Sequence, residues 1–147
     1  ALDTVIGWHK DEHVPLGKTL NADPRNRYIR GSFFDLATAP TTGFDPNHNG
    51  KKFDAILLDI DHSPTEFLNA ANADFYTNEN LGLMAEQLKS GGVFAMWSQN
   101  LADEHFVSLL NTVFEQVDTH VVSFFNPFQG TESTNSVYVC VKNAVLI

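Results

Sequence analysis

The feature that most constrains the fold is the run Phe53–Ile60, FDAILLDI, in which apolar residues follow one another almost without interruption. A strand with one face in water alternates apolar and polar residues, whereas a strand covered on both faces does not alternate. This run has strand length and lacks the alternation. It therefore predicts a central strand of a parallel sheet, buried on both faces.

The chain beyond this run predicts further alternation of helix and strand. Thr77 is suited to cap a helix whose apolar positions are Leu81, Met84, Ala85 and Leu88, and Gly91-Gly92 is suited to end it. A strand over residues 93–98 follows. The stripe from Phe106 to Val117 has helical spacing, and residues 120–125 and 136–142 predict an antiparallel hairpin.

Before the central run the pattern is weaker. Residues 2–9 have the spacing of a short helix, Arg27–Arg30 predicts a strand, and residues 37–52 predict a long loop rich in Pro, Gly, Asn and Thr. With 147 residues the chain has the length of one domain. We therefore expect a single α/β domain over residues 1–147, with a three-layer sheet that is mostly parallel and ends in an antiparallel hairpin.

The charged residues of the sequence limit which classes of binding partner are expected. The chain carries a net charge of −9, and its few basic residues are not clustered, so nucleic acid is not an expected partner. Such a surface suits a cationic ligand, for example an amine or polyamine. The single cysteine, Cys140, and the lack of a signal peptide or a long apolar span predict a cytoplasmic protein that does not enter a membrane.

The residues with the most suggestive chemistry follow the central run. Asp59, Asp61 and His62 lie where the strand ends, and in parallel sheets ligands bind beyond the carboxyl ends of the strands. Two carboxylates there can bind an amine, hold a metal together with His62, or act as base and nucleophile. The alternative is structural: Asp61 caps a turn and Asp59 is an ordinary acid. The other histidines have no metal-ligand spacing, and we predict no metal site.

Several short segments resemble a known family. Residues 23–25, DPR, precede YIRGSFF at 28–34; FDAILLD ends at Asp59; and FYT at 75–77 leads into LKSGGVF at 88–94. In this order and spacing they resemble the latter part of spermidine synthase-like proteins, within the S-adenosylmethionine-dependent methyltransferase folds. The resemblance covers roughly residues 20–142. It implies a Rossmann-like methyltransferase-type domain that lacks its first strands, and therefore a fragment of a longer protein.

The resemblance also implies roles for individual residues. Asp59 would be the catalytic acid that holds or deprotonates an attacking amine. The substrate would contact Asp61, His62, Tyr76 and Trp97, and the cofactor would contact Ser32 and Phe33. The donor would be S-adenosylmethionine for methyl transfer or decarboxylated S-adenosylmethionine for aminopropyl transfer. Because the family's glycine-rich loop and ribose-binding acid do not occur in this sequence, we expect the chain alone to bind no cofactor and to be inactive.

Two other functions stay open. An α/β sheet without its first strands exposes strand edges and apolar surface, which predicts a homodimer and allows a non-catalytic self-association module. The DxD pattern at Asp59 and Asp61 also resembles the start of a haloacid dehalogenase-type phosphatase. That family has Gly and Thr after the second Asp, where this chain has His62 and Ser63.

Overall fold

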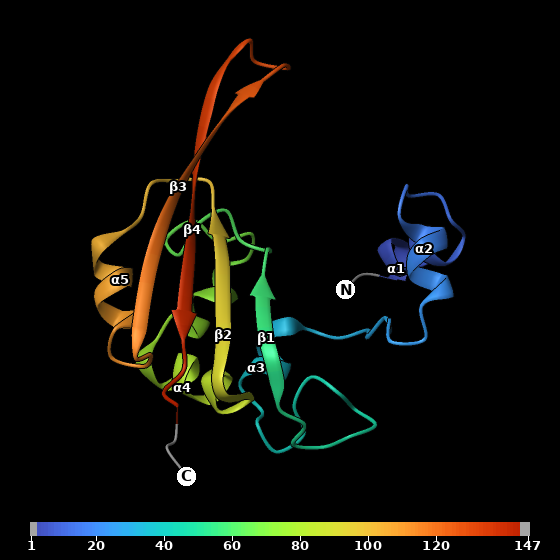
Figure 1. The fold of residues 1–147 in the computed structure, drawn as a ribbon, viewed down its shortest axis with the longest axis horizontal. Helices are drawn as coiled ribbons and strands as arrows, with labels where there is room; N and C mark the ends of the chain where they lie inside the picture. Colours follow the sequence, from blue (N-terminus) through green and yellow to red (C-terminus); the bar gives the residue numbers. More distant parts are fainter. Residues whose placement is uncertain (1–2, 145–147) are drawn as a thin grey trace.

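The computed structural model describes residues 3–144, which form a four-stranded sheet with its helices on one face (Figure 1). The strands are β1 (Phe53–Leu58), β2 (Leu88–Ser98), β3 (Gln116–Asn126) and β4 (Thr131–Val141), in the order β1-β2-β4-β3. β1 and β2 are parallel, and β4 is antiparallel to both β2 and β3. The expected methyltransferase-type α/β sheet with a C-terminal antiparallel hairpin is confirmed. Within residues 3–144 it is a mixed sheet with helices on one face, rather than a mostly parallel sheet in three layers, because only β1 and β2 are parallel.

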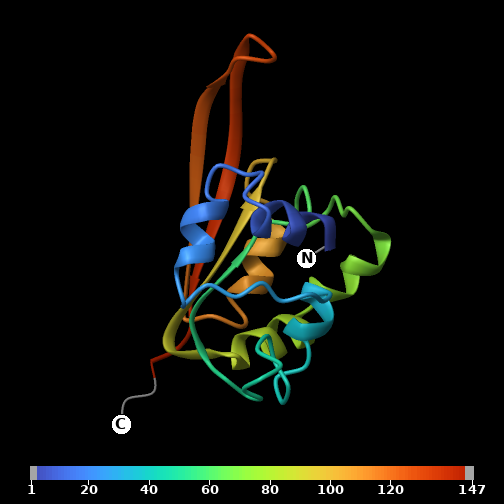
Figure 2. The ribbon, with the colours of Figure 1, turned by 90° about the vertical axis from the view of Figure 1, so that its right-hand side faces the viewer.

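One face of the sheet packs against helices (Figure 2). These are α3 (Phe33–Ala37), the 3-10 helix η1 (Ala70–Phe75), α4 (Asn78–Glu86) and α5 (Glu104–Leu110). Ile56 and Leu58 of β1 point to this side and are buried. The buried alternate residues of the neighbouring strands point the same way: Phe94, Met96 and Ser98 of β2, and Ser136, Tyr138 and Cys140 of β4. The core lies between the sheet and these helices, and it includes Phe94 stacked on Phe114 at 5.9 Å.

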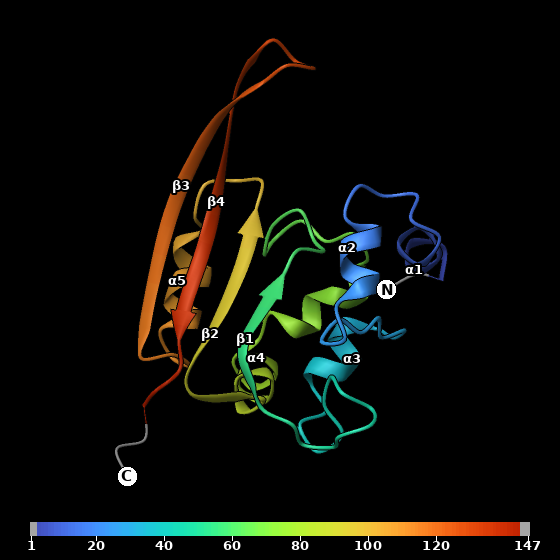
Figure 3. The ribbon, with the colours of Figure 1, turned by 45° about the vertical axis from the view of Figure 1, so that its right-hand side comes forward.

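The opposite face, which we call the open face, consists of Ala55 and Leu57 of β1, Ala95 and Trp97 of β2, and Val137 and Val139 of β4. The strand pairing sets Leu57 beside Ala95, and Ala95 beside Val139, so these side chains share one side of the sheet. No helix within residues 3–144 covers them (Figure 3). Leu57 is consequently 74% exposed, and β1 is an edge strand of the sheet in residues 3–144. The prediction that this strand is central and buried on both faces is therefore wrong.

Residues 3–30 form an N-terminal arm that lies beside β1, apart from the rest of the chain (Figure 1). It contains α1 (Asp3–Lys10) and α2 (Gly17–Ala22). The predicted first helix is confirmed over the described residues, and its first position, Leu2, lies outside them; α2 was not predicted. No residue of α1 is buried, and Trp8 and Leu16 of the arm are exposed.

The strand predicted over Arg27–Arg30 is wrong. A strand needs a partner for its backbone groups, and this segment runs from the arm to α3 beside no other strand of the described residues. Arg27 instead anchors the arm to the loop before β1 by pairing with Asp45. Within the arm, Arg30 pairs with Asp3 at 3.0 Å and the Tyr28 hydroxyl donates to Asn21.

The helix predicted from Phe106 to Val117 is half right. α5 begins after Asp103, whose carboxylate accepts from the Phe106 amide at 2.7 Å, and it ends at Leu110. A turn follows, and β3 starts at Gln116. Phe114 and Val117 still pack against the core, but from the turn and from β3. The apolar residues thus share one buried side, although the chain changes from helix α5 through a turn into strand β3.

The remaining predicted elements are confirmed with shifted ends. Thr77 caps α4 by accepting from the Asn80 amide, and β2 begins earlier than predicted, at Leu88. The helix stop predicted at Gly91-Gly92 is wrong, because α4 already ends at Glu86. Gly91 has a φ of +70°, a conformation that glycine adopts without strain, and it lies within β2 where the pairing with β1 shifts register. Cys140 is a buried core residue as predicted, and burial raises the pKa of its thiol to about 12.

The β3–β4 hairpin is longer than predicted and is joined by a turn at residues 127–130. Its end projects well past the rest of the sheet (Figures 1 and 2). Phe124, Phe125 and Phe128 lie in this end, and all three are exposed. As for membranes, no helix within residues 3–144 has both the length and the apolar character needed to cross one.

Candidate functional site

The candidate site lies where β1 and β2 end and the chain turns. The turn after β1 and the loop after β2 are joined by the Gln99 amide, which donates to the His62 carbonyl at 2.8 Å. Glu66 strengthens this link, because its carboxylate accepts from the side-chain amides of Gln99 at 3.2 Å and Asn100 at 2.9 Å. The two loops therefore form one fixed edge, as expected for the carboxyl ends of neighbouring parallel strands.

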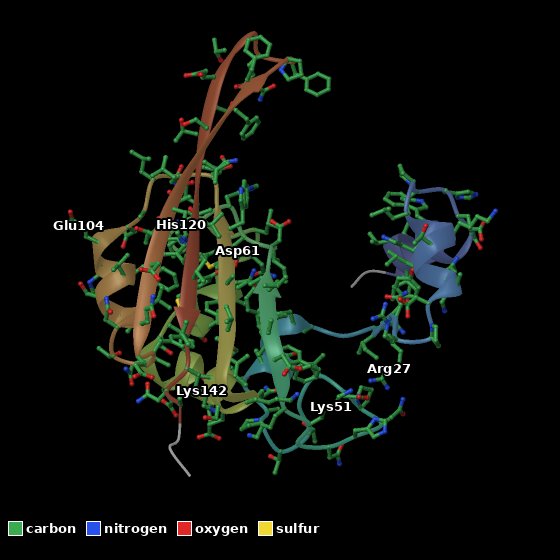
Figure 4. The ribbon with its side chains drawn as sticks, in the orientation of Figure 1. Arg27, Lys51, Asp61, Glu104, His120 and Lys142 are labelled. Carbon is green, nitrogen blue, oxygen red and sulfur yellow. The ribbon has the colours of Figure 1, made fainter. Side chains whose placement is uncertain are left out.

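Asp61 is the buried acid of this edge (Figure 4). One carboxylate oxygen accepts from the Leu68 amide and from the Asn72 side chain, each at 2.8 Å, and the other accepts from the Tyr76 hydroxyl at 2.9 Å. A buried carboxylate needs such donors, because an unsatisfied charge away from water is costly. Asp61 thus ties the turn after β1 to η1 and to the residue that follows it.

Tyr76 is held as a neutral donor. Its ring stacks on Phe67 at 5.3 Å between centroids, and burial together with the neighbouring Asp61 carboxylate raises the pKa of its hydroxyl far above the ordinary value. The hydroxyl therefore keeps its proton at every physiological pH and donates it to Asp61. The structure brings together two residues that the resemblance assigned to the substrate, Asp61 and Tyr76.

Asp59 lies on the other side of the same turn, at the open face. It is exposed and lines a cavity of about 450 Å³ together with Leu57, Trp97 and Val137. No hydrogen bond or ion pair from residues 3–144 engages its carboxylate. Asp59 and Trp97 come from the ends of adjacent parallel strands, so a carboxylate and an aromatic side chain border the same cavity.

Ser32 and Phe33 border a different cavity, of about 430 Å³, with Ile60 and Asn72. The Ser32 hydroxyl accepts from the Asp35 amide and so caps α3, and the Phe33 ring packs on Phe75 at 5.8 Å. Asn72 connects this cavity to Asp61 through the hydrogen bond described above. Two cavities therefore flank the turn at residues 59–61, one beside Asp59 and one beside Ser32.

The positions of Asp59 and Asp61 argue against two other functions considered for the DxD pattern, a phosphatase and a metal site. The carboxylate of Asp61 is buried among donors of the chain, whereas that of Asp59 is exposed at the open face. The two acids therefore do not converge on one position, as a base and nucleophile pair of the phosphatase type would need to do. His62 is exposed as well, and no cluster of three or more His, Cys, Asp or Glu side chains suited to a metal occurs in residues 3–144.

Sequence reasoning missed Glu66, Phe67 and Asn72. Glu66 joins the two loops, Phe67 stacks on Tyr76, and Asn72 joins Asp61 to the Ser32 cavity. One signal could have found Asn72: it lies four residues before Tyr76, so a helical turn would set both side chains on the same side. Glu66 gave no such signal, because its partners follow it by more than thirty residues.

Comparison with solved structures identifies a similar fold. The spermidine synthase of Thermotoga maritima superposes with a TM-score of 0.61 at 14% sequence identity, over 98% of this chain and 43% of that protein. A probable spermidine synthase from Corynebacterium glutamicum ATCC 13032 gives a TM-score of 0.49 at 17% identity, over 89% of this chain and 44% of that protein. This chain therefore spans less than half the length of either protein. No protein-family model and no curated protein sequence matches it.

Proposed function

We propose that this chain forms the amine-binding part of a transferase that moves an aminopropyl or methyl group onto an amine. One observation carries the proposal. Asp59 presents a carboxylate with no partner in residues 3–144, in a cavity that Trp97 also lines, at the carboxyl ends of two parallel strands. The spermidine synthase-like fold supports this reading, because the fold brings the ends of β1 and β2 to one edge.

The chemistry of the cavity suits a cationic ligand. An alkylammonium group gains from a carboxylate at one end and from an aromatic face, which attracts cations through its negative π surface. Before an amine can attack an electrophile it must lose a proton, and Asp59 is placed to accept it. Asp61 and Tyr76 would act on the other side of the turn, where their hydrogen bond holds the segment that follows Asp59.

The donor site is incomplete in the described residues. S-adenosylmethionine or its decarboxylated form would supply the transferred group, and Ser32 and Phe33 border the cavity proposed for it. That cavity offers an apolar wall, but no carboxylate lines it to accept hydrogen bonds from ribose hydroxyls. We therefore derive no step through the donor. Titration of this chain with S-adenosylmethionine in a calorimeter should show no measurable affinity, and micromolar binding would contradict this assignment.

The amine site is tested by calorimetry with 1,4-diaminobutane, using 1,4-butanediol as a neutral ligand of the same shape. We expect the diamine to bind and the diol not to bind. Asp59→Asn should weaken diamine binding about tenfold or more, since it removes the charge but keeps the size of the side chain. The control is Asp54→Asn on the same strand, where the exposed acid pairs with Lys89 at 2.8 Å. Equal losses in both variants would show that only overall charge matters.

A second function is favoured by the open face: self-association. Five of the nine basic residues lie in residues 1–30, whereas fourteen of the eighteen acidic residues follow them. The register places Asp118 of β3 beside Val139, so the open face carries acids along with its apolar side chains. We propose that the N-terminal arm of a second copy, with exposed Trp8 and Leu16, docks on this face to form a homodimer.

The single cysteine supports the cytoplasm as the compartment in which either function operates.

A further inference from the structure

A third cavity, of about 420 Å³, lies at the opposite end of β1 from Asp59, next to the first residue of that strand, Phe53. It is bounded by the segment after α2, by α3 and by the loop before β1. Its volume falls in the range of small-molecule pockets, which runs from about 300 to 1,000 Å³. Figure 4 shows Arg27 and Lys51, two of its bordering residues, in this lower part of the molecule, away from Asp61.

Three phenylalanines form the apolar wall of this cavity. The Phe33 and Phe44 rings are 5.1 Å apart between centroids, and the Phe44 and Phe53 rings are 5.9 Å apart. All three are half-buried, so each packs against its neighbours and still presents some ring surface to the cavity. A wall of this kind favours a flat, apolar ligand body, which can stack on one ring and contact the edge of another.

The polar wall is built around one buried acid. Asp45 is only 2% exposed, and its carboxylate accepts two hydrogen bonds from the Arg27 guanidinium, one from Lys51 at 3.3 Å and one from His48 at 3.0 Å. The Arg27 guanidinium, the main partner, holds the pKa of this carboxyl well below its usual range. Asp45 is therefore always ionised at neutral pH.

The charges around Asp45 do not cancel. One carboxylate faces two basic side chains, those of Arg27 and Lys51, and these are still 39% and 45% exposed. The Lys51 ammonium also lies 5.7 Å from the centre of the Phe53 ring, at the boundary of the apolar wall. A third cation at the rim, Arg25, is paired with Asp23 at 2.5 Å. This corner is thus positive in a chain whose net charge is −9.

We propose that this cavity binds a small planar organic anion, with its flat body on the phenylalanines and its anionic group on Arg27 and Lys51. The buried Asp45 fixes the direction of both cations before a ligand arrives, which lowers the ordering cost of binding. An anionic group that replaces water on the exposed side of Arg27 and Lys51 forms charge-assisted hydrogen bonds, which are stronger than neutral ones. The site is separate from the proposed amine site, so either proposal can fail without the other.

The test uses 2-naphthoate and its neutral counterpart 2-naphthamide, which share the ring system and differ in charge. Calorimetry on the whole chain should show that naphthoate binds at least about tenfold more tightly than naphthamide. Lys51→Gln should reduce this preference to less than about threefold, because it removes one of the two anion ligands while the Arg27–Asp45 pair remains. Equal binding of the two compounds to the unmodified chain would overturn the proposal.

Lys52→Gln is the matched control, since Lys52 is the next residue and its ammonium donates to the Glu86 carbonyl rather than lining the cavity. The control should keep the preference for naphthoate, and a loss equal to that of Lys51→Gln would overturn the proposal. A second measurement needs no variant. Intermolecular NOEs should connect the naphthoate ring protons to those of Phe33 and Phe44, and NOEs only to Trp97 would place the ligand on the open face and refute the site.

Discussion

The two faces of the sheet are made from the same strands, yet helices cover one face and leave the other exposed in residues 3–144. On the helix-covered face Phe94 and Met96 are buried, whereas Leu57 on the open face is largely exposed. Both faces are apolar, which is why the strands read as continuous runs. An apolar run therefore indicates that both sides of a strand are suited to burial. Whether each side is buried depends on which other segments pack against it.

The two acids after β1 divide in the same way. Asp61 turns toward the covered side, where Leu68, Asn72 and Tyr76 satisfy its carboxylate. Asp59 turns toward the open side and has no partner among residues 3–144. An acid whose two oxygens both accept from buried donors stabilises its own loop, and an acid without partners is available to a ligand. Substitutions on the two faces and at the two acids test this difference.

The largest difference is expected between the faces themselves. Phe94→Ala should lower the free energy of unfolding by about 3–5 kcal/mol, because it leaves a cavity beneath the stacked Phe114 ring. Val139→Ala on the open face should cost less than about 1 kcal/mol, since its side chain leaves little buried volume behind. Urea unfolding followed by circular dichroism measures both values. Equal losses would mean that something covers the open face in solution.

The next difference concerns turnover. In the complete transferase that we propose, Asp59→Asn should reduce turnover by about 100-fold or more, because the amine loses its proton acceptor, while the melting temperature stays unchanged. Steady-state kinetics and thermal unfolding on the same preparation provide the two readouts. Near-normal turnover with an unchanged melting temperature would make Asp59 a structural acid and would favour the self-association function.

Asp61→Asn should mainly lower stability, in contrast to Asp59→Asn, which should mainly lower turnover. The asparagine amide supplies one acceptor where the carboxylate supplied two, so a buried donor among Leu68, Asn72 and Tyr76 loses its partner. We expect a loss of about 1–3 kcal/mol in the free energy of unfolding, measured in urea. If Asp61 instead contacts the substrate, as the resemblance implies, the change would mainly weaken binding of the amine. A variant with unchanged stability and only a raised Michaelis constant would support that role.

The smallest effect concerns assembly. Sedimentation equilibrium should show a dimer that dissociates on dilution, and Leu57→Lys should raise its dissociation constant about tenfold or more by placing a charge on the open face. Leu101→Lys is the matched control, because Leu101 is equally apolar and exposed but follows β2 in a loop. A mass equal to one chain at every concentration would remove the basis for the dimer.

The elements best predicted were those whose local signals agree with their surroundings. Thr77 caps α4, the helix face containing Leu81, Met84 and Ala85 is buried, and β1 lies where the apolar run predicted it. These features depend on neighbours in the sequence or on a simple period. The confirmed strand-end placement of Asp59 follows from the same signal, since its position depends only on where β1 ends.

The errors came from features that depend on distant partners. The segment at Arg27–Arg30 has strand composition but no neighbouring strand, and its side chains bind Asp45 and the arm instead. The apolar period across Phe106–Val117 did not reveal the turn after Leu110. In the site, the burial of Asp61 depends on donors seven, eleven and fifteen residues away. A pattern of residue types cannot supply that kind of information.

The projecting β3–β4 hairpin has a consequence for local stability. Near its base, Val117 and Cys140 face each other across the ladder and pack against the core, whereas at its end Phe124 and Phe125 are exposed. Ladder hydrogen bonds there can open without disturbing the core, so amide protons should exchange with solvent fastest beside the turn and progressively more slowly toward Cys140. The hairpin is thus expected to unfold locally from the turn toward its base.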